Sequence, residues 1–357
     1  MTTRAPSERA TRRTEGADGR RQHALVLGKF WPLHAGHQQL IDEAVRVADQ
    51  VTVQLLVHPD EDVPMAVRRS WLAELYPPDR YPGVQIVAAT DDVPTDFDDP
   101  TVWDQHMAII ESLLDAPVDV VLTSDDYGAE LARRLGATWH QVDPGRIEVP
   151  VSGTAVRADP QAYWNHLAPP VRAWYARRIV VTGAESTGTT TLAAALADAL
   201  GAVWVPEYGR EWSAVRPGGL AAPWTTDEFV RIATRQTADE DAAARVTPVR
   251  WVVCDTDAVA TTLWHERYLG TRSPKVDALA DASLSGRATF GSGRPDLVVL
   301  TGDEIGFVQD GLRDGEHVRH AMQHRFRTEL AARNLPWLEV HGSVADRLTQ
   351  VFAALPD

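Results

Sequence analysis

Two histidines three residues apart, in the stretch GKFWPLHAGH, have the type and spacing to bind the phosphates of a nucleotide. His34 and His37 lie where a short apolar stretch gives way to helical spacing, so both can donate an N–H to a phosphate near a helix start. Gly28 lets the backbone approach a ligand closely, and Lys29 can place a mobile positive charge on phosphate oxygens. Only two of the 35 lysines and arginines in the chain are lysines, which makes Lys29 informative.

A second group suited to anions lies in VSGTAVRADP, residues 151–160. Ser152 and Thr154 are of the capping type at a helix start, and Arg157 follows one turn later. Backbone N–H groups, hydroxyls and a guanidinium then converge, as in an anion-binding nest. Alone this would be an ordinary capped helix, but together with the two histidines it predicts a phosphate site in the first half of the chain.

The stretch GAESTGTTT, residues 183–191, has the spacing of a phosphate-binding loop without its lysine. The pattern is G-x-x-x-x-G-K-[ST], and Thr189 stands where the lysine belongs. Most of the binding in such loops comes from backbone N–H groups and a helix N-terminus, which remain here. We therefore expect ATP to bind, with the Thr190 hydroxyl on Mg²⁺. The expected loop residues are Gly183, Ala184, Glu185, Ser186, Thr187, Gly188, Thr189, Thr190 and Thr191.

Other residues could complete a site for phosphoryl transfer around this loop. Glu207 follows the next strand, where nucleoside kinases place a carboxylate near the hydroxyl to be phosphorylated. Asp255 ends a buried strand, which is the position of a carboxylate that binds Mg²⁺. The segment DGLRDGEHVR, residues 310–319, is rich in glycine and basic side chains, as a lid over phosphates would be.

Activity at this second site is a separate question from binding. Threonine at position 189 brings no charge to the β- and γ-phosphates, whereas the usual lysine neutralises them as transfer proceeds. An arginine of the lid, Arg313 or Arg319, could substitute for it. Otherwise we expect the kinase activity to be weak or absent while the fold and a ligand pocket remain.

These groups must be positioned by strands that alternate with helices. Apolar stretches predict strands at 23–28, 51–57, 84–89 and 118–123, with helices at 36–48, 65–75, 101–114 and 127–136. Further strands are predicted at 177–183, 251–255, 296–302 and 336–340, with helices at 189–201 and at the end of the chain. The pattern predicts an α/β protein with two doubly wound parallel sheets.

The change from one series to the next, near 158–177, predicts the domain organisation. We expect a tail at 1–22, a first domain at 23–160, a linker at 161–177 and a second domain at 178–357. The tail carries six arginines with Ser, Thr and Gly and no apolar segment, so we expect disorder. A transit-like segment or an arm that binds nucleic acid is the alternative for the tail.

Composition excludes several classes of protein. The net charge of −15 argues against a broad nucleic-acid surface. The single cysteine, Cys254, excludes an intrachain disulfide and suits a reducing, cytoplasmic setting. No apolar run approaches the length of a membrane span, so we expect no membrane partner. The sequence leaves open whether the protein forms a homo-oligomer.

Taken together, the motifs resemble those of a known enzyme family. GKFWPLHAGH and VSGTAVR are similar to the H-x-G-H and S-x-T-x-x-R motifs of nucleotidyltransferases. Residues 23–357 as a whole resemble the NadR-like family, in which a nicotinamide mononucleotide adenylyltransferase is fused to a ribosylnicotinamide kinase. The resemblance also rests on YW at 163–164, GAESTGTTT, EYGRE at 207–211, DTD at 255–257 and DGLR at 310–313.

The resemblance implies a Rossmann-like nucleotidyltransferase domain followed by a kinase-like domain with a phosphate loop. Its substrates would be ATP with Mg²⁺, nicotinamide mononucleotide and nicotinamide riboside. The implied ATP-binding residues of the first domain are Gly28, Lys29, Phe30, His34, His37, Ser152, Thr154 and Arg157, of which Lys29, His34, His37 and Arg157 are catalytic. Trp103 would stack on the nicotinamide ring. In the second domain Glu207, Tyr208 and Asp257 would bind the riboside, and Thr190 and Asp255 the metal.

The leading hypothesis is therefore an enzyme that makes NAD and pyrophosphate from ATP and nicotinamide mononucleotide. Two alternatives stay open. One is a regulatory protein that senses NAD or ATP through a degenerate kinase domain. The other is an adenylyltransferase of the same fold that acts on a different phosphate substrate.

Overall fold

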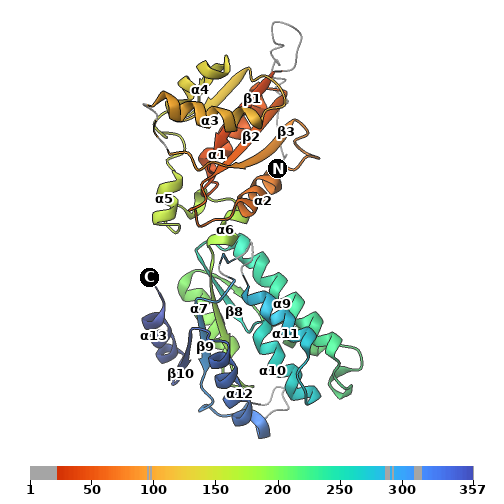
Figure 1. Ribbon diagram of the computed structural model, residues 1–357. Helices are drawn as coiled ribbons and strands as arrows, with labels where there is room; N and C mark the ends of the chain where they lie inside the picture. Colours follow the sequence, from red (N-terminus) through yellow and green to blue (C-terminus); the bar gives the residue numbers. More distant parts are fainter. Residues whose placement is uncertain are drawn as a thin grey trace, which may run out of the picture. The chain divides into compact units, whose positions relative to one another are not determined.

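The structure is a computed structural model that describes residues 22–94, 96, 99–285, 290–291, 293–308 and 316–356. They group into two compact units, each described here by itself (Figure 1). The first unit holds the chain up to Asp159 together with His166–Ala168, and the second holds Pro160–Asn165 and the chain from Pro169 onwards. The segment expected as a linker contains a short turn, η1 (Trp164–His166), and helix α6 (Pro169–Tyr175). Apart from Gln22, the expected tail lies outside the described residues.

The first unit is built on a five-stranded parallel sheet with the order β3-β2-β1-β4-β5. Its strands are β1 (His23–Gly28), β2 (Gln50–Val57), β3 (Val84–Thr90), β4 (Val120–Thr123) and β5 (Thr138–Gln141). In the central strand β1, Leu25 pairs with Thr52 on one side and with Val121 on the other. The strand order reverses between β1 and β4, and folds of this kind bind ligands outside the carboxyl ends of strands at such a point.

Helices cover this sheet and close its core. They are α1 (Ala35–Val47), α2 (Met65–Leu75), α3 (Pro100–Ser112), α4 (Tyr127–Leu135) and the short α5 (Gly153–Ala158). Leu25 and Leu56 of the sheet share one buried apolar cluster with Met107 of α3 and Leu131 of α4. Helix α4 ends at Gly136, whose φ of 66° is the left-handed conformation that closes many helices.

The second unit has its own five-stranded parallel sheet, with the order β10-β9-β6-β8-β7. Its strands are β6 (Arg177–Thr182), β7 (Val203–Val205), β8 (Trp251–Asp255), β9 (Leu297–Thr301) and β10 (Trp337–Val340). Helices α7 (Thr189–Leu200) and α13 (Val344–Ala354) pack beside each other. Leu192 and Leu196 of α7 and Val351 of α13 form a buried core with Val181 and Val299 of the sheet.

The remaining helices of the second unit form a separate group. They are α8 (Tyr208–Val215), η2 (Gly219–Ala221), α9 (Thr226–Val246), α10 (Ala258–Leu269), α11 (Pro274–Leu284), η3 (Glu316–Val318) and α12 (Arg319–Ala332). Figure 1 shows α9, α10 and α11 side by side, and all three contact one another. Ala233, Val259 and Ala280, one from each helix, are buried where they meet.

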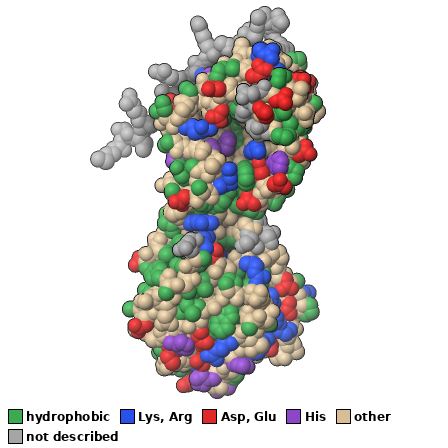
Figure 2. All heavy atoms as spheres, turned by 60° about the vertical axis from the view of Figure 1, so that its left-hand side comes forward, with side chains coloured by type: hydrophobic (Ala, Val, Ile, Leu, Met, Phe, Trp, Pro, Cys, Tyr) green, Lys and Arg blue, Asp and Glu red, His purple; other side chains and the backbone are tan. Residues whose placement is uncertain are grey.

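The predicted fold class is confirmed, because both units are doubly wound α/β folds with parallel sheets. Every strand predicted by residue range is present within two residues of its expected ends. Among the described residues, no helix combines the length and apolar character that crossing a membrane requires. On the face drawn in Figure 2, basic side chains are interspersed with acidic ones.

Candidate functional site

The first unit has a cavity at the carboxyl ends of β1 and β4, beside the first turn of α1. Six of the residues expected from the sequence line it: Gly28, Lys29, His34, His37, Trp103 and Ser152. The fold therefore brings the two-histidine stretch and the start of VSGTAVR to one cavity, although they lie far apart in the sequence. Ser152 also caps α5, because its hydroxyl accepts from the backbone N–H of Ala155 at 3.2 Å.

His34 and His37 stack on each other in this cavity. Their ring centroids are 3.8 Å apart, with 25° between the ring planes. Burial lowers the pKa of His34 to about 4 and lowers the pKa of His37 well below its usual value, and the charge of Arg146 adds to both shifts. Both rings are therefore neutral near pH 7.

The hydrogen bonds of the two rings determine what they can offer a ligand. The backbone N–H of His34 donates to Nδ1 of His37 at 3.4 Å. A neutral His37 then carries its proton on Nε2, which is a donor for a ligand. Nδ1 of His34 is buried in the first turn of α1. The pair can therefore bind phosphate oxygens through neutral N–H groups.

Lys29 is held at the cavity by a buried carboxylate. Its Nζ lies 3.0 Å from Oε1 of Glu61, whose side chain is 3% exposed. The fully buried Arg68 pairs with the other oxygen of Glu61 and donates to the Lys29 carbonyl at 3.0 Å. Although burial raises it, hydrogen bonds from Arg68 and Lys29 hold the pKa of Glu61 below its usual value. Neither Glu61 nor Arg68 was expected from the sequence.

Three of the expected ATP-binding residues are not part of the described cavity wall: Phe30, Thr154 and Arg157. Phe30 is fully buried, and its ring lies 4.9 Å from that of His37. The Arg157 guanidinium stacks on Trp31 at 3.7 Å from the ring centroid, and it donates to the Trp31 carbonyl and to the Thr154 hydroxyl. Arg157 would have to leave Trp31 to reach a bound phosphate.

Trp103 lies both in the core and at the cavity. It is 6% exposed and belongs to the apolar cluster that contains Met107 and Ile110. The guanidinium of Arg134 lies 5.4 Å from its ring centroid. The part of the indole that lines the cavity is available to a planar ligand, but most of the side chain packs against the protein.

Several residues of this cavity were missed from the sequence. Arg146 lines it in a left-handed conformation with φ of 54°, and its guanidinium lies 2.9 Å from Asp125. His106 and Asp91 also line the cavity and form a pair at 2.9 Å. The turn DPGR at 143–146 was the available signal for Arg146, because Pro and Gly in such a turn fix where the next side chain points.

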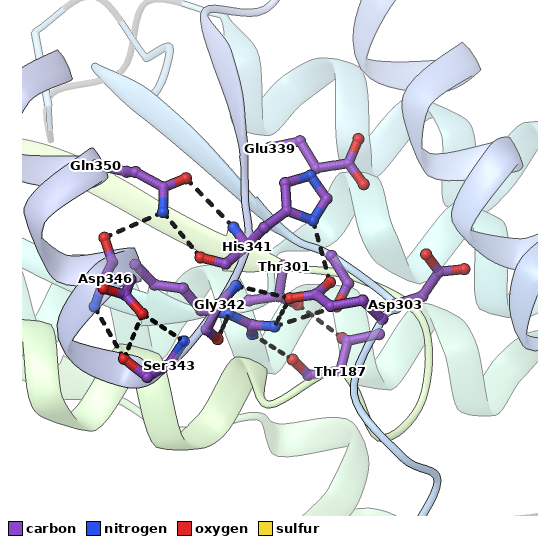
Figure 3. Close-up of polar contacts among 12 residues, drawn as sticks. Thr187, Thr301, Asp303, Glu339, His341, Gly342, Ser343, Asp346 and Gln350 are labelled. Carbon is purple, nitrogen blue, oxygen red and sulfur yellow. Dashed lines mark hydrogen bonds and ion pairs between the residues drawn. The ribbon is translucent and has the colours of Figure 1, made fainter.

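The second unit has a cavity where β6 turns into α7, the position of a phosphate loop. Ten expected residues line it: Gly183, Ala184, Glu185, Ser186, Gly188, Thr189, Thr190, Thr191, Glu207 and Asp255. Thr187 is fully buried instead, and its hydroxyl contacts the Thr301 hydroxyl at 2.7 Å behind the loop (Figure 3).

The loop has the backbone of an anion-binding nest. Ser186 and Gly188 have φ of 60° and 86°, and alternating left-handed residues turn successive N–H groups to one side. A Cβ on Gly183 would lie 2.5 Å from Oγ1 of Thr301, so only glycine fits there. The loop can therefore bind phosphate through its backbone despite the missing lysine.

Thr189 and Thr190 donate hydrogen bonds to Asp255. Burial raises the pKa of Asp255 to about 6, although the two hydroxyls and the charge of Arg210 oppose the shift. A carboxylate beside a hydroxyl is the pair of oxygen ligands that Mg²⁺ takes together with substrate phosphates. Asp255 and Thr190 therefore fit Mg²⁺. The described residues include no group of three His, Cys, Asp or Glu side chains that could hold a metal without a substrate.

The three residues expected at the riboside differ in their placement. Glu207 lines the cavity. The Asp257 carboxylate is 4% exposed and caps α10, since it accepts from the backbone N–H of Ala260 at 2.8 Å. Tyr208 is also absent from the described cavity wall, and it packs beside the cluster of Phe229 and Ile232. Only Glu207 is therefore placed to contact a ligand in this cavity.

Four aromatic side chains also line this cavity and were missed from the sequence. They are Trp224, Phe229, Trp264 and Tyr268. The ring centroid of Trp224 lies 5.2 Å from that of Phe229 and 5.2 Å from that of Tyr268. No motif marks them, because they come from a loop and two helices. Arg210 also lines the cavity, where Glu185, Glu207 and Asp255 are the carboxylates.

The two arginines expected in a lid have different outcomes. Arg313 lies outside the described residues. Arg319 is 7% exposed, is not part of the described cavity wall, and donates to the carbonyl of Ser186 at 3.1 Å. It therefore contacts the outer side of the phosphate loop.

The chain is similar to several known proteins. A family model described as AAA domain matches residues 178–347. The trifunctional NAD biosynthesis/regulator protein NadR of Escherichia coli is 27% identical over 308 residues, which cover 81% of this chain and 71% of that protein. The protein of the same name from Salmonella typhimurium is 27% identical over 336 residues, 88% of this chain and 78% of its own length.

Two solved structures of NadR share the fold. The complex with NR has a TM-score of 0.72 and 22% identity, and it covers 94% of this chain and 96% of its own. The complex with NAD and AMP-PNP has a TM-score of 0.68 and 22% identity, with 94% and 95% covered. The resemblance to NadR predicted from the motifs is thus confirmed, and so is the fold.

Proposed function

We propose that the first unit transfers the adenylyl group of ATP to nicotinamide mononucleotide, forming NAD and pyrophosphate. The stacked, neutral pair of His34 and His37 carries the proposal, because it stands at a helix start in a cavity that Lys29 also lines. Such a site offers N–H donors and a mobile cation to a triphosphate. The similar proteins support the substrate, since two are named for NAD biosynthesis and a similar solved structure contains NAD.

The reaction needs little covalent help from the protein. The 5′-phosphate of the mononucleotide attacks the α-phosphorus of ATP in line, the bond to the bridging oxygen breaks, and pyrophosphate leaves. The attacking phosphate is already ionised, so no general base is required. The Nε2–H of His37 and the Lys29 ammonium would stabilise negative charge on the phosphates in the transition state. Part of the negative charge of the phosphates would be neutralised by Mg²⁺ bound together with ATP.

The nicotinamide ring would lie at the wall that Trp103 shares with the Asp91–His106 pair. The pyridinium of nicotinamide mononucleotide is cationic, and both an aromatic face and a carboxylate favour a cation. This wall therefore distinguishes nicotinamide mononucleotide from phosphates that carry an uncharged or anionic group.

Product analysis tests this function. The purified protein is incubated with ATP, Mg²⁺ and nicotinamide mononucleotide, and NAD and pyrophosphate are measured by chromatography and ³¹P NMR. We expect both in equal amounts. If the mononucleotide is left unchanged while other phosphate acceptors become adenylylated, the proposed adenylyl transfer is correct and the proposed substrate is wrong.

For the second unit we propose that ATP–Mg²⁺ and nicotinamide riboside bind in the cavity at the phosphate loop, with weak or absent phosphoryl transfer. The backbone nest and the Asp255–Thr190 pair suit the triphosphate and Mg²⁺. The aromatic side chains that line the cavity suit a planar ring. Glu207 is a candidate proton acceptor for the hydroxyl that would be phosphorylated. Thr189 supplies no charge to the γ-phosphate, which would limit the transfer step.

A second candidate function for this unit is regulation of the first. Thr189 favours this function, because a site without the lysine can bind ATP but turn over slowly, and such a site can report on nucleotide concentration. The similar proteins are also named as regulators as well as biosynthetic proteins. The test measures NAD formation from saturating ATP and mononucleotide with and without riboside. A rate that changes with riboside while riboside is not consumed supports regulation.

A further inference from the structure

We infer that Arg319 and Arg347 position the phosphate loop of the second unit from its outer side and strengthen its backbone N–H groups as donors to an anion. The inference rests on the nucleotide binding proposed for this loop. Arg319 donates from Nη2 to the carbonyl of Ser186 at 3.1 Å, and Arg347 donates from Nη1 to the carbonyl of Thr187 at 2.6 Å. Two guanidinium groups thus bind consecutive peptide carbonyls just before Gly188 and Thr189.

Arg347 joins the phosphate loop to two neighbouring loops. Its side chain is 3% exposed, its Nε donates to the Gly342 carbonyl at 3.1 Å, and its Nη2 lies 2.8 Å from Oε1 of Glu304. The backbone N–H of Gly342 also donates to Glu304 at 2.9 Å, and His341 contacts the same carboxylate at 3.1 Å. Figure 3 shows Gly342 and His341 in this network together with Thr187 of the phosphate loop.

Arg319 makes the matching contact from α12. It is the first residue of that helix and is 7% exposed. Its Nε is buried, and no described residue hydrogen-bonds to it. Among the described residues, its guanidinium donates to the Ser186 carbonyl. Gln323, one turn further along α12, accepts from the backbone N–H of Ala184 at 3.1 Å, so α12 holds the loop at two points.

These contacts orient the loop for an anion. Ser186 is a non-glycine residue at φ of 60°, a conformation that costs free energy unless its surroundings hold it. A guanidinium on each outer carbonyl keeps the opposite N–H groups facing the cavity and polarises the peptides, so the N–H groups become stronger donors. A Cβ on Gly188 would lie 3.4 Å from Nη1 of Arg347, so this buried charge is next to the loop itself.

Binding measurements test the inference without requiring the second unit to turn over. Arg347→Met and Arg319→Met are compared with the wild type in the full-length chain, by calorimetry with ATP–Mg²⁺ and separately with nicotinamide riboside. All of these chains, including the wild-type reference, also carry Lys29→Met and His37→Ala, which remove phosphate-binding groups proposed for the first unit, so that the ATP titration reports the second unit. We expect each variant to bind ATP–Mg²⁺ roughly tenfold or more weakly, the scale of one charge-assisted hydrogen bond, while riboside affinity is unchanged. Arg333→Met is the control, because Arg333 lies at the other end of α12 and pairs with Asp281 and Glu329. It should leave both affinities unchanged.

The outcomes separate the inference from the function on which it rests. Wild-type ATP affinity in both variants overturns the inference, and so does an equal loss of ATP and riboside binding, which would indicate a general structural role. If the wild type itself does not bind ATP at this loop, both the nucleotide site and the inference fail. Melting curves establish that the variants fold. If Arg347→Met does not fold, Arg347→Lys shows whether the buried charge is needed for folding. The ATP affinity of Arg319→Met then decides whether the inference holds.

Discussion

Lys29 and Glu61 form an ion pair of 3.0 Å in which the carboxylate is 3% exposed and the lysine side chain is 54% exposed. The buried Arg68 fixes the Glu61 carboxylate. This carboxylate in turn restrains the flexible side chain of Lys29. The lysine remains accessible to a ligand in the cavity. Glu61 is therefore a positioning residue for the cation that we expect on the ATP phosphates.

Replacing Glu61 should reveal this dependence. Glu61→Gln removes the charge that restrains Lys29, so we expect NAD formation to fall by about tenfold, equivalent to ~1.4 kcal/mol of barrier. The decisive comparison is made in a Lys29→Met background, where Glu61→Gln should cause no further loss of rate. Additive losses would mean that Glu61 acts independently of Lys29. Thermal melting is followed in parallel, because the substitution also leaves Arg68 without its buried partner.

A variant of Trp103 can show whether its indole contacts the ligand or only packs in the core. Truncation to alanine would destabilise the fold by roughly 3–5 kcal/mol, so Trp103→Leu is preferable because it retains an apolar side chain in the core. If the indole contacts the nicotinamide ring, this variant should bind the mononucleotide more weakly by roughly 1–2 kcal/mol and ATP as before. Equal losses for both substrates, measured by calorimetry, would indicate that Trp103 only packs.

The raised pKa of Asp255 predicts an unusual titration. With a pKa of about 6, the carboxyl is protonated between pH 4 and 6, where an ordinary aspartate is already ionised. Its ability to hold Mg²⁺ should therefore decline as the pH falls through about 6. The ¹³C NMR signal of the carboxyl, assigned by its loss in Asp255→Asn, reports the midpoint. Thr189→Val removes one donor to the carboxylate and should raise the midpoint, and a midpoint near 4 in the wild type would contradict the assignment.

Restoring the missing lysine tests whether its absence limits phosphoryl transfer in the second unit. Thr189→Lys should raise phosphorylation of nicotinamide riboside by about an order of magnitude or more, within the range of single groups that stabilise charge. The measurement is the initial rate of mononucleotide formation. A wild-type rate of about 1 s⁻¹ or more, ordinary for a kinase, would show instead that other groups already supply the charge.

Much of the fold was predictable because both sheets are parallel and buried. Strands such as β1 and β9 appear in the sequence as continuous apolar runs. The short strand β5 (TWHQ) lies at a sheet edge and has no fully buried position, so no apolar run marks it. The edge strand β7 was expected before Glu207, but its bounds were not given. Helix α9, with 21 residues, was not delimited because its polar residues outnumber its apolar ones.

The candidate sites were predictable only where chemistry is concentrated in one short stretch. His34, His37 and the loop at Gly183–Thr191 are local motifs, and the structure places most of them at cavities. Arg146, Arg347 and the aromatic residues at the second cavity come from separate turns and helices, and only the folded chain brings them to the sites. Arg157 was expected on ATP but stacks on Trp31, a partner that residue types alone do not indicate.

The most direct test of adenylyl transfer in the first unit is the effect of His37→Ala on NAD formation. His37 is the donor whose Nε2–H is left for a ligand, so its loss should lower kcat by about 10²-fold or more, the scale of one preorganised donor. His58→Ala is the control, because His58 lies outside the described cavity wall. Both variants are compared with the wild type in ATP–Mg²⁺ and nicotinamide mononucleotide, after melting curves confirm their folding. A strong loss in His37→Ala alone is the predicted result, and a folded His37→Ala protein that makes NAD at the wild-type rate would contradict the assignment of this site.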